Sequence, residues 1–501
     1  MTARDPLLEA LRALVGEANV LVAEADTAPY VRDWRGQYPG RARAVVRPGS
    51  TAEVSAVVKL CAREGVAIVP QGGNTGLVGA STPDASGREV VLSVLRMNRV
   101  RRVDAVDNTM TVEAGAVLRA VQDEALRHER LFPLSLAAEG SATIGGNLAT
   151  NAGGEQVLRY GNTRDLVLGI EAVLADGRVL DLLSPLRKDN TGYALRDLLV
   201  GSEGTLAIIT AATLKLFARP REQVTLWASL ESPARAVELL GRLRTHLGER
   251  VTAFEIMGRE AVVQVERHIE GARVPLGAAP WSVLAEIAET APGTPLRSLA
   301  ETTLAGALED GIVADVALAE SLAQAESMWH IRDHVPEAQT REGASIKHDI
   351  SVPVSRIAEF IEEAGRELRE AIPGARLVTF GHVGDGNLHY NLTRPAAGDD
   401  SAFLAEAHRV HEIVYRHVAR LGGSISAEHG IGRAKQEAFL RYKNPVAVDV
   451  MRAVKRVLDP ANLLNPGRLL PLEEAGPNGP WRQTLPPAAP PTGSQRQPEK
   501  P

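Results

Sequence analysis

Two glycine-rich segments constrain this chain more than any other feature of its sequence. The first, Pro70-Gln-Gly-Gly-Asn-Thr-Gly-Leu-Val-Gly-Ala-Ser81, follows an apolar strand pattern, and the second runs from Pro133 to Gly154 and is rich in Gly, Asn, Ser and Thr. Glycine lets backbone N–H groups approach a diphosphate without a Cβ clash, and compact domains rarely keep so long a loop unless it binds something. A surface turn is the alternative for the first segment alone, but the pair predicts an extended phosphate-bearing ligand.

Histidines and one carboxylate form a second pattern near the C-terminus. Gly381-His-Val-Gly-Asp-Gly-Asn-Leu-His389-Tyr-Asn391 places two histidines around a glycine-rich turn, and Ala427-Glu-His-Gly430 follows after a helical stretch. His and carboxylate are ligand types of catalytic transition-metal sites. A single strand histidine is more often structural, but the flanking glycines indicate tight backbone geometry instead of bulk packing. The pattern therefore predicts a metal site.

Composition excludes several classes of protein. The 501 residues are 44% apolar and 24% charged, with a net charge of −6 and one cysteine, Cys61. The length predicts two to three domains, and the acidic balance argues against nucleic-acid binding. A single cysteine allows no internal disulfide and fits a reducing compartment, so we expect a cytoplasmic protein. We expect neither a signal peptide nor a membrane span, because no long apolar run is present.

Periodicity divides the chain into two regions of different rhythm. The first, up to Pro220, alternates helices and strands around an irregular stretch at 133–163. The second contains β-α-β units, one long helix over 319–340, and strands over 345–352 and 375–382. After Leu470 the chain is rich in Pro, Gly and Gln, which predicts a disordered tail.

Three segments carry a resemblance to a known family. Pro70 to Gly79, Glu139 to Gly154 and Gly201-Ser-Glu-Gly-Thr205 resemble the vanillyl-alcohol-oxidase (PCMH) type of FAD-binding domain, over roughly residues 20–220. The chain up to about residue 470 resembles the D-2-hydroxyacid dehydrogenase branch. D-2-hydroxyglutarate dehydrogenases, D-lactate dehydrogenases and glycolate oxidase FAD subunits belong to this branch.

The resemblance implies an α+β fold. It implies an FAD-binding domain of two α+β subdomains over 1–220, a ferredoxin-like substrate or cap domain over 221–422, a C-terminal segment over 423–470 that returns to the flavin, and the tail over 471–501. FAD should be non-covalent, because no histidine lies in residues 70–81. The implied cofactor-binding residues are Pro70, Gly72, Gly73, Asn74, Thr75, Gly76, Ser81, Pro133, Gly140, Thr143, Gly146, Asn147, Thr150, Ile209 and Asn465.

The resemblance also assigns roles at the predicted metal site. It implies that His382, His389 and Glu428 bind a divalent metal, usually zinc in this branch, and that His429 is the general base. A 2-hydroxy acid can chelate a cation through its hydroxyl and carboxylate, which lowers the hydroxyl pKa before hydride transfer to flavin N5. The implied substrate-binding residues are Arg332, Lys347 and Asn391.

One departure and several alternatives remain open at this point. Pro336 stands where the hydroxyglutarate-specific enzymes carry a threonine, and proline offers neither a side-chain donor nor an N–H. A D-lactate or glycolate dehydrogenase is therefore the first alternative. A metallohydrolase and a flavin-binding subunit without its own activity are alternatives of other classes. For the dehydrogenase we expect an electron-transfer flavoprotein, a cytochrome or a quinone as acceptor, and a homodimer.

Overall fold

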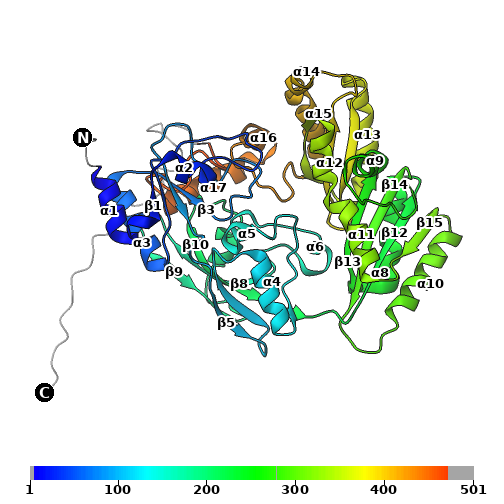
Figure 1. The fold of residues 1–501 in the computed structure, drawn as a ribbon, viewed down its shortest axis with the longest axis horizontal. Helices are drawn as coiled ribbons and strands as arrows, with labels where there is room; N and C mark the ends of the chain where they lie inside the picture. The colour runs from blue at the N-terminus through cyan, green and yellow to red at the C-terminus, as the bar shows by residue number, and fades with distance from the viewer. Residues whose placement is uncertain (1–4, 278, 472–501) are drawn as a thin grey trace.

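The computed structural model describes residues 5–277 and 279–471, which form two α+β regions side by side (Figure 1). The predicted α+β class is confirmed. The disordered tail expected over 471–501 lies outside the described residues, apart from Pro471. No helix among the described residues is long and apolar enough to cross a bilayer.

The first region is built on two sheets. A four-stranded sheet has the order β1 (Val20–Leu21), β2 (Ala44–Val46), β4 (Val90–Ser93), β3 (Ile68–Gln71), with β2, β4 and β3 parallel. An antiparallel sheet has the order β5 (Val100–Asp104), β6 (Thr109–Glu113), β10 (Ile208–Lys215), β8 (Val167–Val173), β9 (Val179–Leu182), and β7 (Arg130–Leu131) pairs with β11 (Phe217–Ala218). The helices are α1 (Pro6–Val15), α2 (Glu24–Thr27), α3 (Thr51–Glu64), α4 (Leu118–Arg127), α5 (Ile144–Thr150), α6 (Val157–Tyr160) and α7 (Leu195–Leu199).

Capping residues fix the elements that flank the first glycine-rich segment. The hydroxyl of Ser50 accepts the N–H of Glu53 at 3.2 Å at the start of α3, and Gly65 ends the helix in the left-handed conformation. These are the signals expected of a capping box and a glycine C-cap. The helix buries Cys61 and its apolar neighbours. The turn at Gly65 then leads the chain into β3.

The stretch predicted as irregular over 133–163 contains two short helices. Thr143 caps α5, because its Oγ1 accepts the N–H of Gly146 at 3.4 Å, and Asn151 ends the helix in the left-handed conformation. Hydrophobic periodicity misses a helix of this length with two internal glycines, because glycine opposes helix formation on average. Tertiary packing decides its conformation.

The second region is one large antiparallel sheet covered on both faces. Its order is β15 (Asp315–Leu318), β12 (Glu222–Leu230), β14 (Trp281–Glu289), β13 (Val251–Gly258), β18 (Arg376–His382), β19 (Asn387–Thr393), β16 (Ser345–Ile346), and β17 (Asp349–Ser351) also pairs with β19. Side chains alternate between the faces: Leu226 and Ala228 join the core with one helix layer, whereas Trp227 joins the core on the other face. The first layer contains α8 (Pro233–Leu247), α10 (Leu296–Glu309), α13 (Ile357–Ala371), α14 (Asp400–Ala405) and α15 (Ala407–Arg420), and the second contains α9 (Arg259–His268), α11 (Leu322–Asp333) and α12 (Val335–Glu342).

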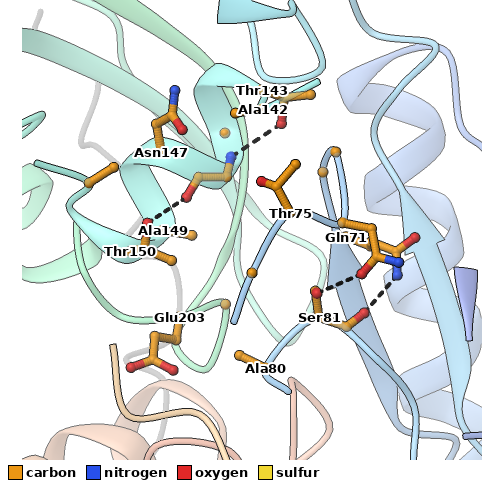
Figure 2. Close-up of a pocket in the computed structure, with 18 of the residues that line it drawn as sticks. Gln71, Thr75, Ala80, Ser81, Ala142, Thr143, Asn147, Ala149, Thr150 and Glu203 are labelled. Atoms are coloured by element: carbon orange, nitrogen blue, oxygen red, sulfur yellow. Dashed lines mark hydrogen bonds between the residues drawn. The ribbon is translucent and has the colours of Figure 1, made fainter. Parts of the chain in front are cut away.

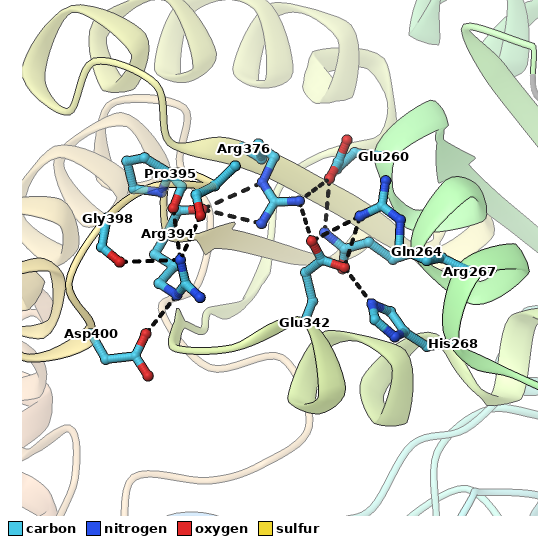
Figure 3. A network of polar contacts seen from close by, with 11 residues as sticks. Glu260, Gln264, Arg267, His268, Glu342, Arg376, Arg394, Pro395, Gly398 and Asp400 are labelled. Carbon is cyan, nitrogen blue, oxygen red and sulfur yellow. Dashed lines mark hydrogen bonds and ion pairs between the residues drawn. The ribbon is translucent and has the colours of Figure 1, made fainter.

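The prediction of a single helix over 319–340 is wrong, because the chain forms α11 and α12 with a break at His334. Pro336 lies in the first turn of α12, and a proline ring clashes with the preceding turn of a continuous helix. A polar network holds α12 in its place: Glu342 pairs with Arg267 of α9 and with Arg376 of β18 (Figure 3).

The C-terminal part returns to the first region. After α15, the chain forms α16 (Gln436–Tyr442) and α17 (Pro445–Leu458), which are drawn in orange with the first region (Figure 1). Val454 and Leu458 of α17 pack against the core of the first region. Ile68 of β3 forms a parallel bridge with Leu464, which is fully buried in the core of the first region. The segment between α15 and α16 therefore spans the two regions.

Candidate active site

The loop after β3 packs too closely against its neighbours to carry side chains at two positions. A Cβ atom on Gly72 would lie 2.3 Å from Thr143 Oγ1, and one on Gly73 would lie 1.9 Å from the carbonyl oxygen of Ser141. Asn74 then adopts a left-handed conformation, with φ of 54°. The two glycine-rich segments that were predicted separately therefore form one surface.

This surface presents donors that the protein itself does not use. The backbone N–H groups of residues 72–76 donate to no acceptor within the described residues. Asn147 Nδ2 is buried and also lacks an acceptor there, and Figure 2 shows Asn147 with Thr75 and Thr143 around the cavity. A row of free N–H groups suits a diphosphate, so these residues fit a large phosphate-bearing cofactor.

The predicted cofactor residues divide into two groups. Most line the cavity: Pro70, Gly72, Gly73, Asn74, Thr75, Gly76, Ser81, Thr143, Gly146, Asn147, Thr150 and Ile209. Pro133, Gly140 and Asn465 are not among the lining residues. The Asn465 amide instead donates to the carbonyl oxygens of Ala80 and Glu203 at 3.0 and 2.8 Å. Individual cofactor contacts stay predictions.

Polar side chains from this loop also hold the loop itself. Ser81 Oγ donates to Asn74 Oδ1 at 2.9 Å, and Asn74 Nδ2 donates to the carbonyl oxygens of Pro29 and Arg32 at 3.1 and 2.9 Å. Asn74 therefore offers its backbone to a ligand, while its side chain anchors the segment over residues 29–32.

Four potential metal ligands meet between β17, β19 and the segment after α15. The ligand atoms of Asp349, His389, Glu428 and His429, here called the metal cluster, all lie within 4.8 Å of one another. The antiparallel register places Asp349 opposite His389, and His389 Nε2 lies 3.4 Å from Glu428 Oε1. Glu428 and His429 also line the cavity formed by the glycine-rich segments. The two predicted motifs therefore open into one space.

His382 lies beside the metal cluster and has a carboxylate behind it. Its ring centroid is 6.0 Å from that of His389, and its Nδ1 is 2.5 Å from Oε1 of Glu255, which is fully buried opposite it in the sheet. Burial lowers the His382 pKa, but Glu255 outweighs it and raises the pKa to about 9. A carboxylate on Nδ1 fixes the tautomer and leaves Nε2 for a metal, as is usual for histidine ligands.

Asp349 supports the cluster through its hydrogen bonds. Its Oδ2 accepts the backbone N–H groups of Glu428 and His429 at 3.1 and 3.0 Å, and its Oδ1 accepts Asn387 Nδ2 at 3.0 Å. Although burial raises the Asp349 pKa, the neighbouring His429 and Lys435 hold it far below its ordinary value. Because protein donors occupy both oxygens, Asp349 is better suited to hold the loop than to bind a metal.

Burial and neighbouring charges shift the pKa values of Glu428 and His429, the two cluster residues that line the cavity. Burial, with the charge of Asp349, raises the Glu428 pKa to about 7. Burial lowers the His429 pKa to about 4. A neutral imidazole near pH 7 can accept a proton.

The three predicted substrate residues differ in their availability. Arg332 is buried, its Nε donates to Glu255 Oε2 at 2.6 Å, and its guanidinium lies 5.0 Å from the ring centre of Phe380. Lys347 forms no hydrogen bond or ion pair with any described residue. Asn391 is already engaged, because its Nδ2 donates to Gln339 at 2.9 Å and its Oδ1 accepts the N–H of His348 at 2.9 Å. The substrate role of Asn391 stays a prediction that competes with these bonds.

Sequence reasoning missed the buried carboxylates behind the site. Glu255 is the one charged residue in β13, a strand that is otherwise apolar except for a threonine. A fully buried glutamate needs paired cations, so this isolated charge was the signal that could have found it. Asp349 follows Lys347 in a segment that looked like an ordinary strand, and nothing nearby in the sequence marks it.

Comparisons with known proteins agree with this geometry. Residues 219–469 match the family model described as FAD linked oxidases, C-terminal domain, and residues 42–183 match the FAD binding domain. The chain is 38% identical to a probable mitochondrial D-2-hydroxyglutarate dehydrogenase of Oryza sativa subsp. japonica, covering 92% of this chain and 81% of the relative. It is also 38% identical to the D-2-hydroxyglutarate dehydrogenase of Xanthomonas citri pv. viticola, covering 95% and 99%.

Solved structures share the fold. An alkyldihydroxyacetonephosphate synthase superposes with a TM-score of 0.70 at 18% identity, covering 92% of this chain and 86% of that one. The substrate-bound p-cresol methylhydroxylase also gives 0.70 at 18% identity, covering 92% and 96%. The predicted PCMH-type architecture is thereby confirmed.

Proposed function

Because this chain belongs to the FAD linked oxidases, we propose that it is a metal-assisted D-2-hydroxyacid dehydrogenase that converts 2-hydroxyglutarate, or a similar acid, to the 2-oxo acid. The chain is an FAD-dependent oxidoreductase. One observation carries the proposal: Glu428 and His429 line the same cavity as the glycine-rich segments. Relatives named D-2-hydroxyglutarate dehydrogenase support the choice of substrate.

The proposed chemistry needs both a hydride acceptor and positive charge at the substrate hydroxyl. Bound FAD supplies the acceptor, and a divalent cation held by His382, His389 and Glu428, zinc in our proposal, would lower the hydroxyl pKa. The His and carboxylate donors of this set fit such a cation. The position of His382, fixed by Glu255, adds to that fit.

His429 is the proposed general base. Its Nδ1 lies 3.5 Å from Asp349 Oδ2 and its Nε2 lies 3.8 Å from Glu428 Oε1. A carboxylate beside one ring nitrogen orients the imidazole and stabilises the cation that forms when the other nitrogen takes a proton, as in hydrolase triads. We therefore assign the substrate hydroxyl proton to Nε2.

The cations near the site favour a substrate with two carboxylates. Arg332 can bind one carboxylate with nitrogens that Glu255 does not use. Lys347 of the second region lies near His429. Burial and the nearby charge of Arg35, from the first region, lower the Lys347 pKa to about 8. Within the described residues, the guanidinium of Arg35 also forms no hydrogen bond or ion pair. Two neighbouring cations that form no ion pair with a described residue suit a second carboxylate, as 2-hydroxyglutarate would supply.

D-lactate is the second candidate substrate. Pro336 lies in the first turn of α12, three residues after the end of α11, and offers no hydrogen-bond donor toward a distal carboxylate. A monocarboxylic acid would need no such donor. The metallohydrolase alternative leaves the free N–H groups of residues 72–76 without a purpose, and the inactive-subunit alternative leaves His429 without one.

The test is dye-linked turnover of D- and L-2-hydroxy acids by the purified flavoprotein, with and without prior chelation. We expect activity with D-enantiomers only, loss on chelation, and recovery with Zn²⁺. We also expect Lys347→Gln to raise KM for 2-hydroxyglutarate more than for lactate. A yellow protein that oxidises none of these acids would contradict the proposal. Non-covalent FAD, the electron acceptor (an electron-transfer flavoprotein, a cytochrome or a quinone), a cytoplasmic location and a homodimer stay predictions.

A further inference from the structure

The segment that carries Glu428 and His429 is held at both ends by buried carboxylates from different regions. We call residues 428–432 the catalytic loop. Asp349 of the second region accepts the first two N–H groups of this loop, as described above. Glu203 of the first region accepts the N–H groups of Ile431 and Gly432, both at 2.8 Å.

Glu203 is itself fixed by the walls of the cavity that the glycine-rich segments line, here called the flavin pocket. Its N–H donates to the carbonyl oxygen of Ala149 at 2.8 Å, at the end of α5, and its own carbonyl oxygen accepts Asn465 Nδ2 at 2.8 Å. It is 6% exposed, lines the cavity, and has φ of 52°. A glutamate rarely adopts this left-handed conformation. The backbone that carries its carboxylate is therefore hydrogen-bonded to the pocket wall on both sides.

The catalytic loop passes Glu203 at a distance that only glycine permits. A Cβ atom on Gly430 would lie 2.8 Å from Glu203 Oε1 and 3.0 Å from its Cδ, and Gly430 has φ of 83°. Close approach and a left-handed backbone both require glycine there. The hydrogen bonds of Glu203 and the conformation of Gly430 thus depend on each other.

We propose that Glu203 is a positioning residue that sets the place of His429 relative to the flavin. Asp349 fixes one end of the catalytic loop to the second region, and Glu203 fixes the other end to the pocket wall. Hydrogen bonds from N–H groups to a buried carboxylate are short and strong, so the loop cannot shift without breaking them. The inference rests on the proposed role of His429 as the base.

The first test is Glu203→Gln. The glutamine amide has one acceptor oxygen and can accept only one of the N–H groups of Ile431 and Gly432. Its NH₂ group then faces the other N–H group, which has lost its acceptor. We expect the rate of flavin reduction by substrate, measured in single turnovers per bound flavin, to fall about tenfold, because small misplacements of reacting groups cost this much or more. Substrate Kd, FAD content and metal content should stay within about twofold, since Asp349 still accepts the N–H group of Glu428, the proposed metal ligand.

A purely structural role would give a different result. It would lower the yield of holoenzyme or its Tm, but it would leave the reduction rate per bound flavin unchanged. Glu289→Gln is the matched control, because Glu289 also accepts two consecutive backbone N–H groups, at 2.7 and 2.8 Å, in the second region. The control should reduce its flavin at the wild-type rate.

Hydrogen exchange separates this inference from the proposed function. In a peptide covering the catalytic loop, Glu203→Gln should speed amide exchange, and Gly430→Ala should do the same even if Glu203→Gln folds poorly. If the wild-type protein oxidises no 2-hydroxy acid, the proposed function fails. The exchange result still tests whether Glu203 holds the catalytic loop in place. Unchanged exchange in both variants, or a wild-type reduction rate in Glu203→Gln, would overturn the inference.

Discussion

The flavin pocket and the metal cluster are adjacent but are built by opposite means. The pocket uses glycines, backbone N–H groups and small uncharged side chains such as Thr143 and Asn147. The metal cluster and the adjacent His382 depend on buried carboxylates: Glu255 is hydrogen-bonded to His382, and Asp349 accepts N–H groups of the catalytic loop. Close backbone packing therefore determines the geometry of the pocket, whereas paired charges determine the geometry of the cluster. Changes in one half should leave ligand binding in the other half intact.

Glu428→Ala should have the largest effect. Removal of a ligand carboxylate should release the metal and lower turnover about 10³-fold, because a cation at the hydroxyl contributes several kcal/mol. Elemental analysis and dye-linked turnover measure both effects. Glu437→Ala, at a side chain that is 86% exposed, is the control. A protein that also lost its FAD would contradict the separation of the two halves.

Glu255→Gln should have the next largest effect. A neutral amide holds His382 and Arg332 less firmly, and substitution of such supporting groups weakens metal binding about 10–100-fold. Titration of the apoprotein with Zn²⁺ gives the affinity. Glu286→Gln is the control, because this half-buried carboxylate on the neighbouring strand accepts a hydrogen bond from Thr252 instead of a histidine. Equal losses in the two variants would mean that charge burial alone matters.

Gly73→Ala should affect only the pocket. The added methyl group overlaps the carbonyl oxygen of Ser141, and overpacking of this kind costs about 1–3 kcal/mol. FAD affinity should fall about tenfold, while zinc content stays at the wild-type level. Flavin fluorescence on dilution measures the first quantity. A drop in metal content would show that the halves are coupled through the loop at 70–81.

Glu342→Gln should give the smallest effect and should not affect either ligand. Burial raises the Glu342 pKa, but Arg376, His268 and Arg267 outweigh it and lower the pKa to about 2. A carboxylate with a depressed pKa stabilises the fold above its ordinary pKa, and this stabilisation is lost as pH falls from about 4.5 toward 2. Because solvent screens the pairs, we expect about 1 kcal/mol at pH 7. Thermal unfolding should show the gap between variant and wild type closing over that acid range.

The sequence predicted the parts of the site that are contiguous in the chain. The loop at 70–81 and the stretch at 133–154 were identified from their glycines, and they do line one cavity. His389, Glu428 and His429 were identified from two short motifs, and they do come together, whereas His382, the third predicted ligand, lies beside that group. By contrast, the break between α11 and α12 was missed, although Pro336 was its local signal.

Only the tertiary structure revealed what holds those motifs. Glu255, Glu203 and Asp349 come from three distant segments, and each acts through hydrogen bonds to residues far along the chain. A glycine or a histidine restricts its own backbone or chemistry and can be recognised where it stands. The role of a buried carboxylate depends on which donors the fold brings to it, because desolvation makes its energy a property of its partners. The sequence by itself therefore determined the motifs that we propose to hold FAD and a metal, whereas packing decided which charges position those motifs.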